Sequence, residues 1–359
     1  MTYLPAVSVA SNQDVTTRST GKLTPLYRGN RPPVSGEEVS SLASLWARKY
    51  VASVTYQKET DALRQQPDLT TATSREGRAE TVLRLMQQLS FASARAWSMT
   101  ETLLSAEMQR HQIDSSLVNP WQIAGDTHAL FEKALKAYTE RVTPRRLSVV
   151  IGSAFGQMRQ KYVAVDPRVL GFVSMQFHNT GLVLLEKLSH TEQLLLNPYL
   201  KVMDDHMYMP LRQTYTAAAQ HELESPALQA VQKLLPLSTR IALAVCEQVS
   251  RQNPGYRSSG GLLNSSTVRT SSIRDVEMFQ VYLCLCVLEG SIQSVQRELF
   301  PLCVMLYPNL NVSWHLVQSM LQTLSWEMHD RLSPDALAIF LPYLQVFQEM
   351  FSPEVFGGR

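Results

Sequence analysis

Cysteine, glycine and long apolar runs are all scarce in this chain of 359 residues. The cysteines are Cys246, Cys284, Cys286 and Cys303. So few thiols argue against a disulfide framework, and the spacing of Cys284 and Cys286 differs from the C-x-x-C pattern of metal and redox sites, so we expect buried structural thiols. The longest apolar run, Val281 to Leu288, is far shorter than the roughly 20 residues that cross a bilayer, so the sequence predicts no membrane span.

Signature motifs of nucleotide-binding and hydrolytic enzymes are also missing. The sequence contains no G-x-G-x-x-G, phosphate loop, G-x-S-x-G or H-E-x-x-H, and its Gly260-Gly261 pair is not followed by a phosphate-binding pattern. We therefore expect no catalytic residue, no cofactor and no metal. A non-enzymatic protein is favoured, and an enzyme stays an open alternative.

The charge of the chain is unevenly distributed. The formal net charge is only +2, yet the first 36 residues carry four cations, Arg18, Lys22, Arg28 and Arg31, against the single acid Asp14. Residues 1–34 also have few large apolar side chains, so they cannot offset the entropy of ordering. We expect a disordered basic arm there. The remaining chain, with 45% hydrophobic residues overall, has ample material for a core.

A capping residue followed by proline recurs along the chain. The pairs are Asn119-Pro120, Thr143-Pro144, Asp166-Pro167, Asn197-Pro198, Ser225-Pro226, Ser333-Pro334 and Ser352-Pro353. An oxygen at the N-cap accepts free backbone N–H groups, and proline at the first helical position loses no hydrogen bond, so each pair predicts a helix start. Ser35 with Glu38 and Ser272 with Asp275 resemble capping boxes, and Gly290 predicts a helix stop.

These signals and the apolar periodicity predict an all-α protein, a globular bundle of about a dozen helices. The predicted helices are 37–65, 76–112, 120–141, 144–162, 167–188, 198–222 with a break at Pro210, 226–234, 238–252, 273–289, 291–307, 312–331 and 334–351. A helical solenoid is the alternative, although no self-similar repeat is found. Leu147–Phe155 and Val281–Leu288 could be strands, but both follow helix caps, so we interpret them as helical.

One long break interrupts the helical pattern. Residues 253–271 are rich in Ser and Gly and predict a flexible loop. The loop separates an N-terminal helical domain, 35–252, from a C-terminal helical region, 272–359. The alternative is a mobile loop on a single domain that contains both regions.

Ionisable and polarisable groups are densest at the predicted break near Pro210. Asp204, Asp205, His206 and Tyr208 are candidates for contacting a ligand or partner, because Pro210 leaves backbone carbonyls without donors just before it. The favoured alternative is a kinked helix with its Met and Tyr side chains packed inward and both aspartates facing water.

Arginines form the second group of candidates. Arg274 lies near the start of the helix predicted over 273–289, where a cation is unfavourable unless an acidic side chain or an external anion offsets it. Pairing with an acid elsewhere in the fold is the favoured interpretation. Arg141, Arg145 and Arg146 straddle a predicted helix start and are candidates for anion contacts.

Three runs of the sequence carry a family resemblance. They are Tyr199-Leu-Lys-Val-Met-Asp-Asp-His-Met-Tyr-Met-Pro-Leu, Ser271-Ser-Ile-Arg-Asp-Val-Glu-Met-Phe-Gln-Val-Tyr-Leu and Glu298-Leu-Phe-Pro-Leu-Cys-Val-Met-Leu-Tyr-Pro. The C-terminal half with these runs resembles an uncharacterised family of soluble cyanobacterial proteins. The resemblance implies a phototroph's cytoplasm or thylakoid surface, and it implies no activity, ligand or catalytic residue.

These features favour a non-enzymatic helical module that binds another protein, a second copy included, as regulator, adaptor or assembly factor. The alternative is an enzyme or small-ligand carrier with an interhelical pocket near Asp204–Pro210. A nucleic-acid-binding regulator is a second alternative, which the nearly neutral total charge disfavours. Because Met1–Ser11 lacks the positive region of a signal peptide, we expect a cytoplasmic protein.

Overall fold

A computed structural model describes residues 42–52 and 66–356. The basic arm predicted over 1–34, the capping box of Ser35 and Glu38, and most of the helix predicted over 37–65 lie outside these described residues. Ser40–Arg359 form one compact unit that includes both sides of the boundary predicted at 253–271. Independent folding of the two sides stays a prediction.

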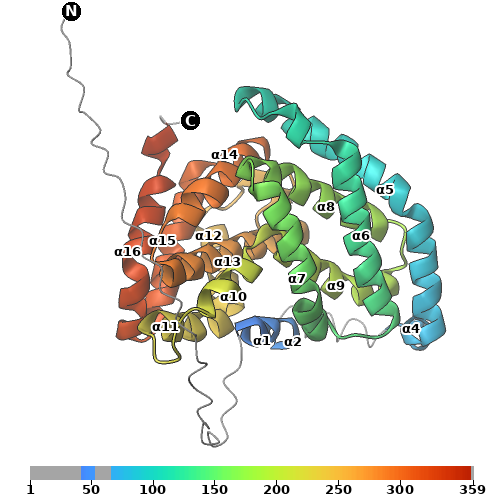
Figure 1. The fold of residues 1–359 in the computed structure, drawn as a ribbon, viewed down its shortest axis with the longest axis horizontal. Coiled ribbons are helices and arrows are strands. Elements are labelled where there is room, and N and C mark those ends of the chain that lie inside the picture. The colour runs from blue at the N-terminus through green and yellow to red at the C-terminus, as the bar shows by residue number, and fades with distance from the viewer. Residues whose placement is uncertain (1–41, 53–65, 357–359) are drawn as a thin grey trace, which may run out of the picture. The chain divides into compact units, whose positions relative to one another are not determined.

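The described part of the chain is helical apart from one short hairpin, so the predicted all-α class is confirmed (Figure 1). Its α-helices are α1 (Leu42–Ala47), α2 (Lys49–Ala52), α4 (Leu69–Thr73), α5 (Arg75–Arg110), α6 (Pro120–Thr139), α7 (Pro144–Val163), α8 (Leu170–Leu185), α9 (His190–Tyr208), α10 (Leu211–Ala218), α11 (Pro226–Leu234), α12 (Ser238–Gln252), α13 (Ser266–Glu289), α14 (Phe300–Asn309), α15 (Trp314–Arg331) and α16 (Pro334–Met350). Shorter elements are the 3-10 helices η1 (Ser115–Leu117), η2 (Pro167–Val169), η3 (Leu235–Leu237) and η5 (Pro353–Phe356), the π-helix η4 (Val295–Leu299), and the antiparallel strands β1 (Arg257–Ser258) and β2 (Gly261–Leu262).

Most of the predicted helix starts are confirmed. The side chains of Asn119 and Thr143 accept backbone N–H groups at the starts of α6 and α7, each with proline at the first helical position. The proline pairs also begin α11 and α16, and Asp166-Pro167 begins η2, which continues into α8. Gly290 ends α13 with a φ of 60°, the left-handed conformation that glycine adopts without steric cost.

The start predicted at Asn197-Pro198 is wrong, because Pro198 lies inside α9. The helix begins at His190 with a capping box: the hydroxyl of Ser189 accepts the N–H of Glu192 at 3.3 Å, and the Glu192 carboxylate accepts the N–H of Ser189 at 3.0 Å. Two satisfied donors at this end outweigh the single hydrogen bond that proline removes further along the helix.

The start predicted at Ser272 is also wrong. The helix α13 begins at Ser266, so Ser272 and Asp275 lie inside it and form no capping box. The break between α12 and α13 is correspondingly shorter than the predicted 253–271, and it contains the β1–β2 hairpin, in which Arg257 pairs with Leu262.

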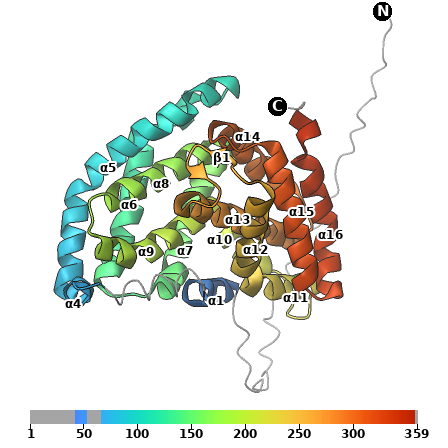
Figure 2. The ribbon, with the colours of Figure 1, turned by 180° about the vertical axis from the view of Figure 1, so that it is seen from behind.

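The helix α13 is the centre of the fold. Every residue from Val276 to Leu288 is buried, and α10, α11, α12 and α16 all pack against this helix (Figures 1 and 2). On another side, the long α5 packs against α6 and α8. Because α13 contacts helices distant in the sequence, the packing is that of a globular bundle and excludes the solenoid alternative. Both segments that could have been strands, Leu147–Phe155 and Val281–Leu288, are helical.

The apolar surfaces of these helices face one another within the bundle. Cys284, Cys286 and Cys303 are buried and Cys246 is partly buried, and none forms a disulfide. Among the described residues, no helix has both the length and the hydropathy that a membrane crossing requires.

Candidate functional site

The last turn of α9 presents three consecutive polar side chains to three different neighbours. An α-helix turns by about 100° per residue, so Asp204, Asp205 and His206 face in different directions. The helix ends at Tyr208, and Met209 and Pro210 separate it from α10. The predicted break at Pro210 is therefore confirmed.

Asp204 joins α9 to α8 and α13. Its Oδ2 atom lies 2.8 Å from Nδ1 of His178 and 3.7 Å from a guanidinium nitrogen of Arg274. Arg274 also pairs with Asp275 at 3.3 Å, and its guanidinium carbon lies 3.9 Å from the centre of the Tyr208 ring. These contacts bring two of the predicted candidates, Asp204 and Arg274, together with a third, Tyr208.

Arg274 lies more than two turns inside α13, so the expectation that it sits near the positive end of its helix is wrong. Its pairing with Asp204, an acidic side chain on another helix, agrees with the interpretation favoured from the sequence. Stacking on an aromatic ring adds a favourable interaction that a guanidinium makes especially well.

Asp205 lies in a buried cluster of four charges. Its side chain and that of Glu277 are 0% exposed, and the Lys49 ammonium lies 2.9 Å from the first and 2.7 Å from the second. Lys201 contacts the same two carboxylates at 3.1 and 3.4 Å, and the Tyr50 hydroxyl donates to Asp205 at 2.8 Å. The alternative in which both aspartates face water is therefore wrong for Asp205.

Opposite charges offset one another in this cluster. Burial opposes the charge on Asp205, but the ammonium groups of Lys201 and Lys49 outweigh burial and lower the pKa of the carboxyl. Burial lowers the pKa of Lys49, and the adjacent carboxylates of Asp205 and Glu277 partly offset this effect. With two positive and two negative groups, the cluster has no net charge, and it ties α2, α9 and α13 together.

His206 faces α7. Its Nδ1 atom lies 2.8 Å from the carbonyl of Val202, and because a carbonyl can only accept, Nδ1 carries the proton. The other ring nitrogen is 3.5 Å from the Ser148 hydroxyl. Burial lowers the pKa of His206, so the ring is neutral near pH 7. This contact packs α9 against α7.

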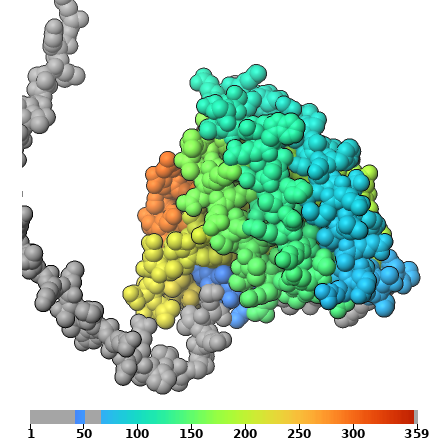
Figure 3. All heavy atoms as spheres, turned by 45° about the vertical axis from the view of Figure 1, so that its right-hand side comes forward, coloured from blue at the N-terminus to red at the C-terminus, as the bar shows by residue number. Residues whose placement is uncertain are grey.

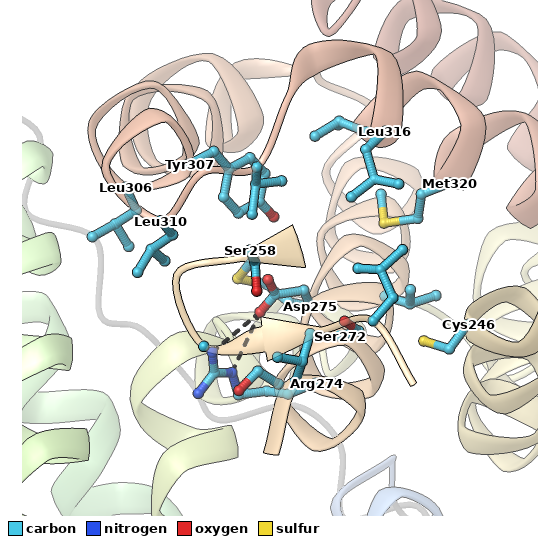
Figure 4. Close-up of a pocket in the computed structure, with 18 of the residues that line it drawn as sticks. Cys246, Ser258, Ser272, Arg274, Asp275, Leu306, Tyr307, Leu310, Leu316 and Met320 are labelled. Atoms are coloured by element: carbon cyan, nitrogen blue, oxygen red, sulfur yellow. Dashed lines mark hydrogen bonds and ion pairs between the residues drawn. The ribbon is translucent and has the colours of Figure 1, made fainter. Parts of the chain in front are cut away.

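A pocket of about 330 Å³ opens beside Arg274 (Figure 4). The lining residues come mainly from α8, α12, α13, α14 and α15 and include Tyr208, Arg274 and Asp275. Leu306, Leu310, Leu316 and Met320 supply apolar walls around the Arg274–Asp275 pair (Figure 4). Burial raises the pKa of Asp275 despite the neighbouring Arg274. The pocket thus offers apolar surface with one ion pair at its edge.

A second pocket, of about 440 Å³, shares part of this wall. Arg274 and His178 line both pockets, whereas Asp204, Asp205 and Lys201 line only the second. Of the predicted candidates, Tyr208 therefore borders the first pocket, Asp204 and Asp205 border the second, and Arg274 borders both, whereas His206 lines neither.

The predicted anion contacts lie apart from these pockets. Arg141, Arg145 and Arg146 are exposed, and none of them lines either pocket. The guanidinium of Arg141 donates to the carbonyl of Thr73 at 2.8 Å, which joins the end of α6 to α4.

Several charged residues of the interior were missed from the sequence. Lys49, Arg159 and Glu277 are buried, and His178 and Lys201 are half-buried. Arg159 contacts the Tyr282 hydroxyl and Glu298, each at 3.1 Å, and joins α7 to α13 and η4. Glu277 carried the clearest signal, because it is an acid shortly before the long apolar run Val281–Leu288.

Burial leaves two of the thiols with little reactivity. Burial raises the pKa of Cys246 and of Cys286 to about 12, which keeps both thiols protonated and weakly nucleophilic. Within residues 42–52 and 66–356, no group of three or more His, Cys, Asp or Glu side chains is arranged to hold a metal ion.

A family model described as "Phycobilisome protein" matches residues 201–350. The match runs from the second half of α9 to the end of α16 and includes Asp204, Asp205 and Arg274. The match supports the resemblance to a cyanobacterial helical family, and it does not support the description of that family as uncharacterised. No curated protein and no solved structure matches the chain.

Proposed function

We propose that this protein is a non-enzymatic helical module that assembles with another protein as a component or assembly factor of a phycobilisome. The observation that carries the proposal is the match of residues 201–350 to phycobilisome proteins, which spans the central α13 and its neighbours. A phycobilisome component acts in a phototroph's cytoplasm, which is the location we propose.

Two exposed tryptophans support a protein partner. Trp121 at the start of α6 is 87% exposed, and Trp326 on α15 is 74% exposed. Tryptophan is enriched at the centres of protein interfaces, where its burial contributes much of the binding energy. Trp326 lies in the matched region, and Trp121 lies outside it.

Affinity capture tests this proposal. A tagged chain expressed in a phototroph should retain a stoichiometric partner that mass spectrometry identifies as a phycobilisome protein. Trp326→Asp or Trp121→Asp should reduce the captured amount by tenfold or more, about 1.4 kcal/mol, while Gln345→Asp at an exposed position of α16 should not. Capture of no phycobilisome protein would contradict the proposal, and full capture by both tryptophan variants would exclude these surfaces.

A small-ligand carrier is the second candidate function, and the pocket at Arg274 favours it. Its apolar walls and single ion pair suit an apolar molecule that carries one acidic group. The anionic dye anilinonaphthalene sulfonate should bind the folded chain with one-to-one stoichiometry. Arg274→Ala should weaken binding about tenfold, and Lys133→Glu on exposed α6 surface should not. A dye affinity that is the same in Arg274→Ala and in the wild-type chain would exclude this pocket as the binding site.

A further inference from the structure

Two pairs of helices that lie apart in the fold carry opposite charges. Residues 120–163, which form α6 and α7, contain seven Lys or Arg and three Asp or Glu, a formal charge of +4. Residues 314–356, which include α15 and α16, contain one Arg and five Asp or Glu, a formal charge of −4. Figures 1 and 2 show α16 at one edge of the molecule, away from α7. One copy of the chain therefore presents a basic region and an acidic region in different places.

The outward face of α7 has a cation near each end and apolar residues after the first of them. Positions three or four apart share one face of a helix. The α7 stripe is this set of exposed residues: Arg146, Val149, Val150, Ser153, Gln157 and Lys161. The two valines are 41% and 58% exposed, and Figure 3 shows the green part of the chain, which includes α7, on an open face of the molecule.

Neighbouring contacts leave the α7 stripe positive. Lys161 pairs with Asp126 at 2.5 Å, yet 43% of its side chain stays exposed. The exposed Arg212 on α10 donates to the carbonyl of Ser153 at 2.8 Å, which places a further cation beside the middle of the stripe. A surface that docks here should therefore be acidic.

The outward face of α16 has the reverse arrangement, with an acid near each end. The α16 stripe is this set of exposed residues: Asp335, Ala338, Leu341, Pro342, Gln345 and Glu349. The single cation of residues 314–356 is Arg331, which pairs with Glu327 and Asp330 on its own helix. The acids of the stripe thus keep their charge available to a partner.

The two stripes match in length. A helix rises by about 1.5 Å per residue, so Arg146 and Lys161 are about 22 Å apart along α7, and Asp335 and Glu349 are about 21 Å apart along α16. If the two helices lie side by side, a cation of α7 can face an acid of α16 at both ends at once.

The apolar residues determine which way the helices point. With the helices parallel and Arg146 opposite Asp335, Val149 lies beside Ala338, and Leu341 follows one turn further on. With the helices antiparallel, Val149 would instead lie beside the polar Gln345. Parallel helices therefore satisfy both the charges and the apolar side chains.

We propose that the α7 stripe of one copy binds the α16 stripe of a second copy of this chain, with the two helices parallel. Each copy uses two different surfaces, so the contact is heterologous. One helix against one helix buries less than the roughly 1,600 Å² of a standard interface, so the association is weak, and salt weakens it further. The inference does not rest on the proposed phycobilisome partner, because it is tested on the purified chain alone.

Sedimentation equilibrium of the purified chain tests the contact. At about 50 mM salt the weight-average mass should rise above that of one copy as the concentration increases, and about 500 mM salt should reverse the rise. Arg146→Glu and Asp335→Lys should each weaken the association tenfold or more, because each places like charges opposite one another. Lys187→Glu, at an exposed site after α8, should leave it unchanged. A wild-type chain that remains a single copy at every concentration would overturn the proposal.

Mixing the two variants tests which surfaces meet. Each variant keeps one native stripe, so α16 of the Arg146→Glu chain can bind α7 of the Asp335→Lys chain. The two should bind each other within about threefold of the wild-type affinity, although each associates weakly by itself. Both substitutions are at exposed positions, so both chains should fold, which circular dichroism checks. A mixture that associates no better than its components would contradict the pairing of α7 with α16.

Double variants test the direction of the helices. In the chain with both Arg146→Glu and Asp335→Lys, opposite charges face each other again, so self-association should recover. In the chain with both Arg146→Glu and Glu349→Lys, parallel helices bring like charges together at both ends, so association should stay weak. Failure of the first chain to recover, or recovery of the second, would overturn the parallel arrangement.

Discussion

The Lys49 ammonium lies 2.7 Å from a carboxylate oxygen of Glu277, and both side chains are buried although 228 positions separate them. Lys49 comes from α2, and Glu277 comes from the helix at the centre of the fold. Glu277 also accepts a hydrogen bond of 2.6 Å from Thr239 at the start of α12. One carboxylate thereby joins segments from three parts of the chain.

Removal of this carboxylate should be costly. Glu277→Ala leaves the buried Lys49 and the half-buried Lys201 with Asp205 alone, and loss of one member of a buried pair typically costs about 3 to 5 kcal/mol. Glu247→Ala is the matched control, because its pair with Arg251 is more than 60% exposed on both sides (66% and 63%) and contributes about 0.5 kcal/mol or less. Urea unfolding of both variants measures the difference. Equal losses of unfolding free energy in Glu277→Ala and Glu247→Ala would contradict a large contribution of the buried cluster to stability.

Acid should destabilise the fold through His206. Burial lowers the pKa of His206 in the folded chain, whereas the unfolded chain titrates near 6.5. The unfolded state therefore binds more protons below that value. The contribution of neutral His206 to the free energy of unfolding is fully present above about pH 6.5. It is lost as the pH falls toward the folded pKa, with a slope of at most about 1.4 kcal/mol per pH unit.

Unfolding experiments between pH 7.5 and 5.5 measure this slope. His206→Gln should flatten it, while His329→Gln at an exposed position of α15 should leave it unchanged. An unaltered slope in His206→Gln would assign the pH dependence to other groups.

Two glycines should respond to alanine in opposite directions. Gly290 ends α13 at a φ of 60°, where a Cβ atom is strained, so Gly290→Ala should lose about 1 kcal/mol. Gly125 lies inside α6 with nothing within 4 Å of an added Cβ, so Gly125→Ala should gain about 0.5 to 1 kcal/mol. Thermal unfolding measures both changes. A stabilising Gly290→Ala would contradict the left-handed helix end.

The Arg274→Ala variant should show whether Arg274 stabilises the fold or contacts the protein partner. The side chain pairs with Asp204 and Asp275 and stacks on Tyr208, so its loss should lower the free energy of unfolding by about 2 to 4 kcal/mol. Urea unfolding measures the loss, and capture of the protein partner should persist. Unchanged stability with lost capture would instead make Arg274 a direct partner contact.

Local signals in the sequence predicted most of the fold. Asn119 and Thr143 cap their helices as predicted, because capping depends on residues two or three positions away. Pro198 misled the prediction because the capping box at Ser189, a Ser-x-x-Glu pattern visible in the sequence, determines the start of α9. At α13, the first turn is a polar Ser/Thr-rich stretch that resembles a loop in composition.

The site was predictable only in part, because its contacts are between distant residues. The run of ionisable groups at Asp204–Pro210 includes Asp204 and Asp205, which border the second pocket, and Tyr208, which borders the first. The burial of Asp205 depends on Lys49 and Tyr50, the latter 155 positions away, and no local pattern encodes such a pairing. Arg141 is exposed and lies outside both pockets. The basic composition around it did not predict this, because composition does not specify which cations lie close together in the fold.

Sedimentation velocity of the purified chain mixed with purified phycobilisomes tests the proposed assembly role most directly. The account predicts that the wild-type chain co-sediments with the large complex at a saturable stoichiometry, and that Trp326→Asp or Trp121→Asp shifts the chain to the slow boundary. A chain that sediments separately from phycobilisomes and from their dissociated components at every ratio would contradict the proposed function.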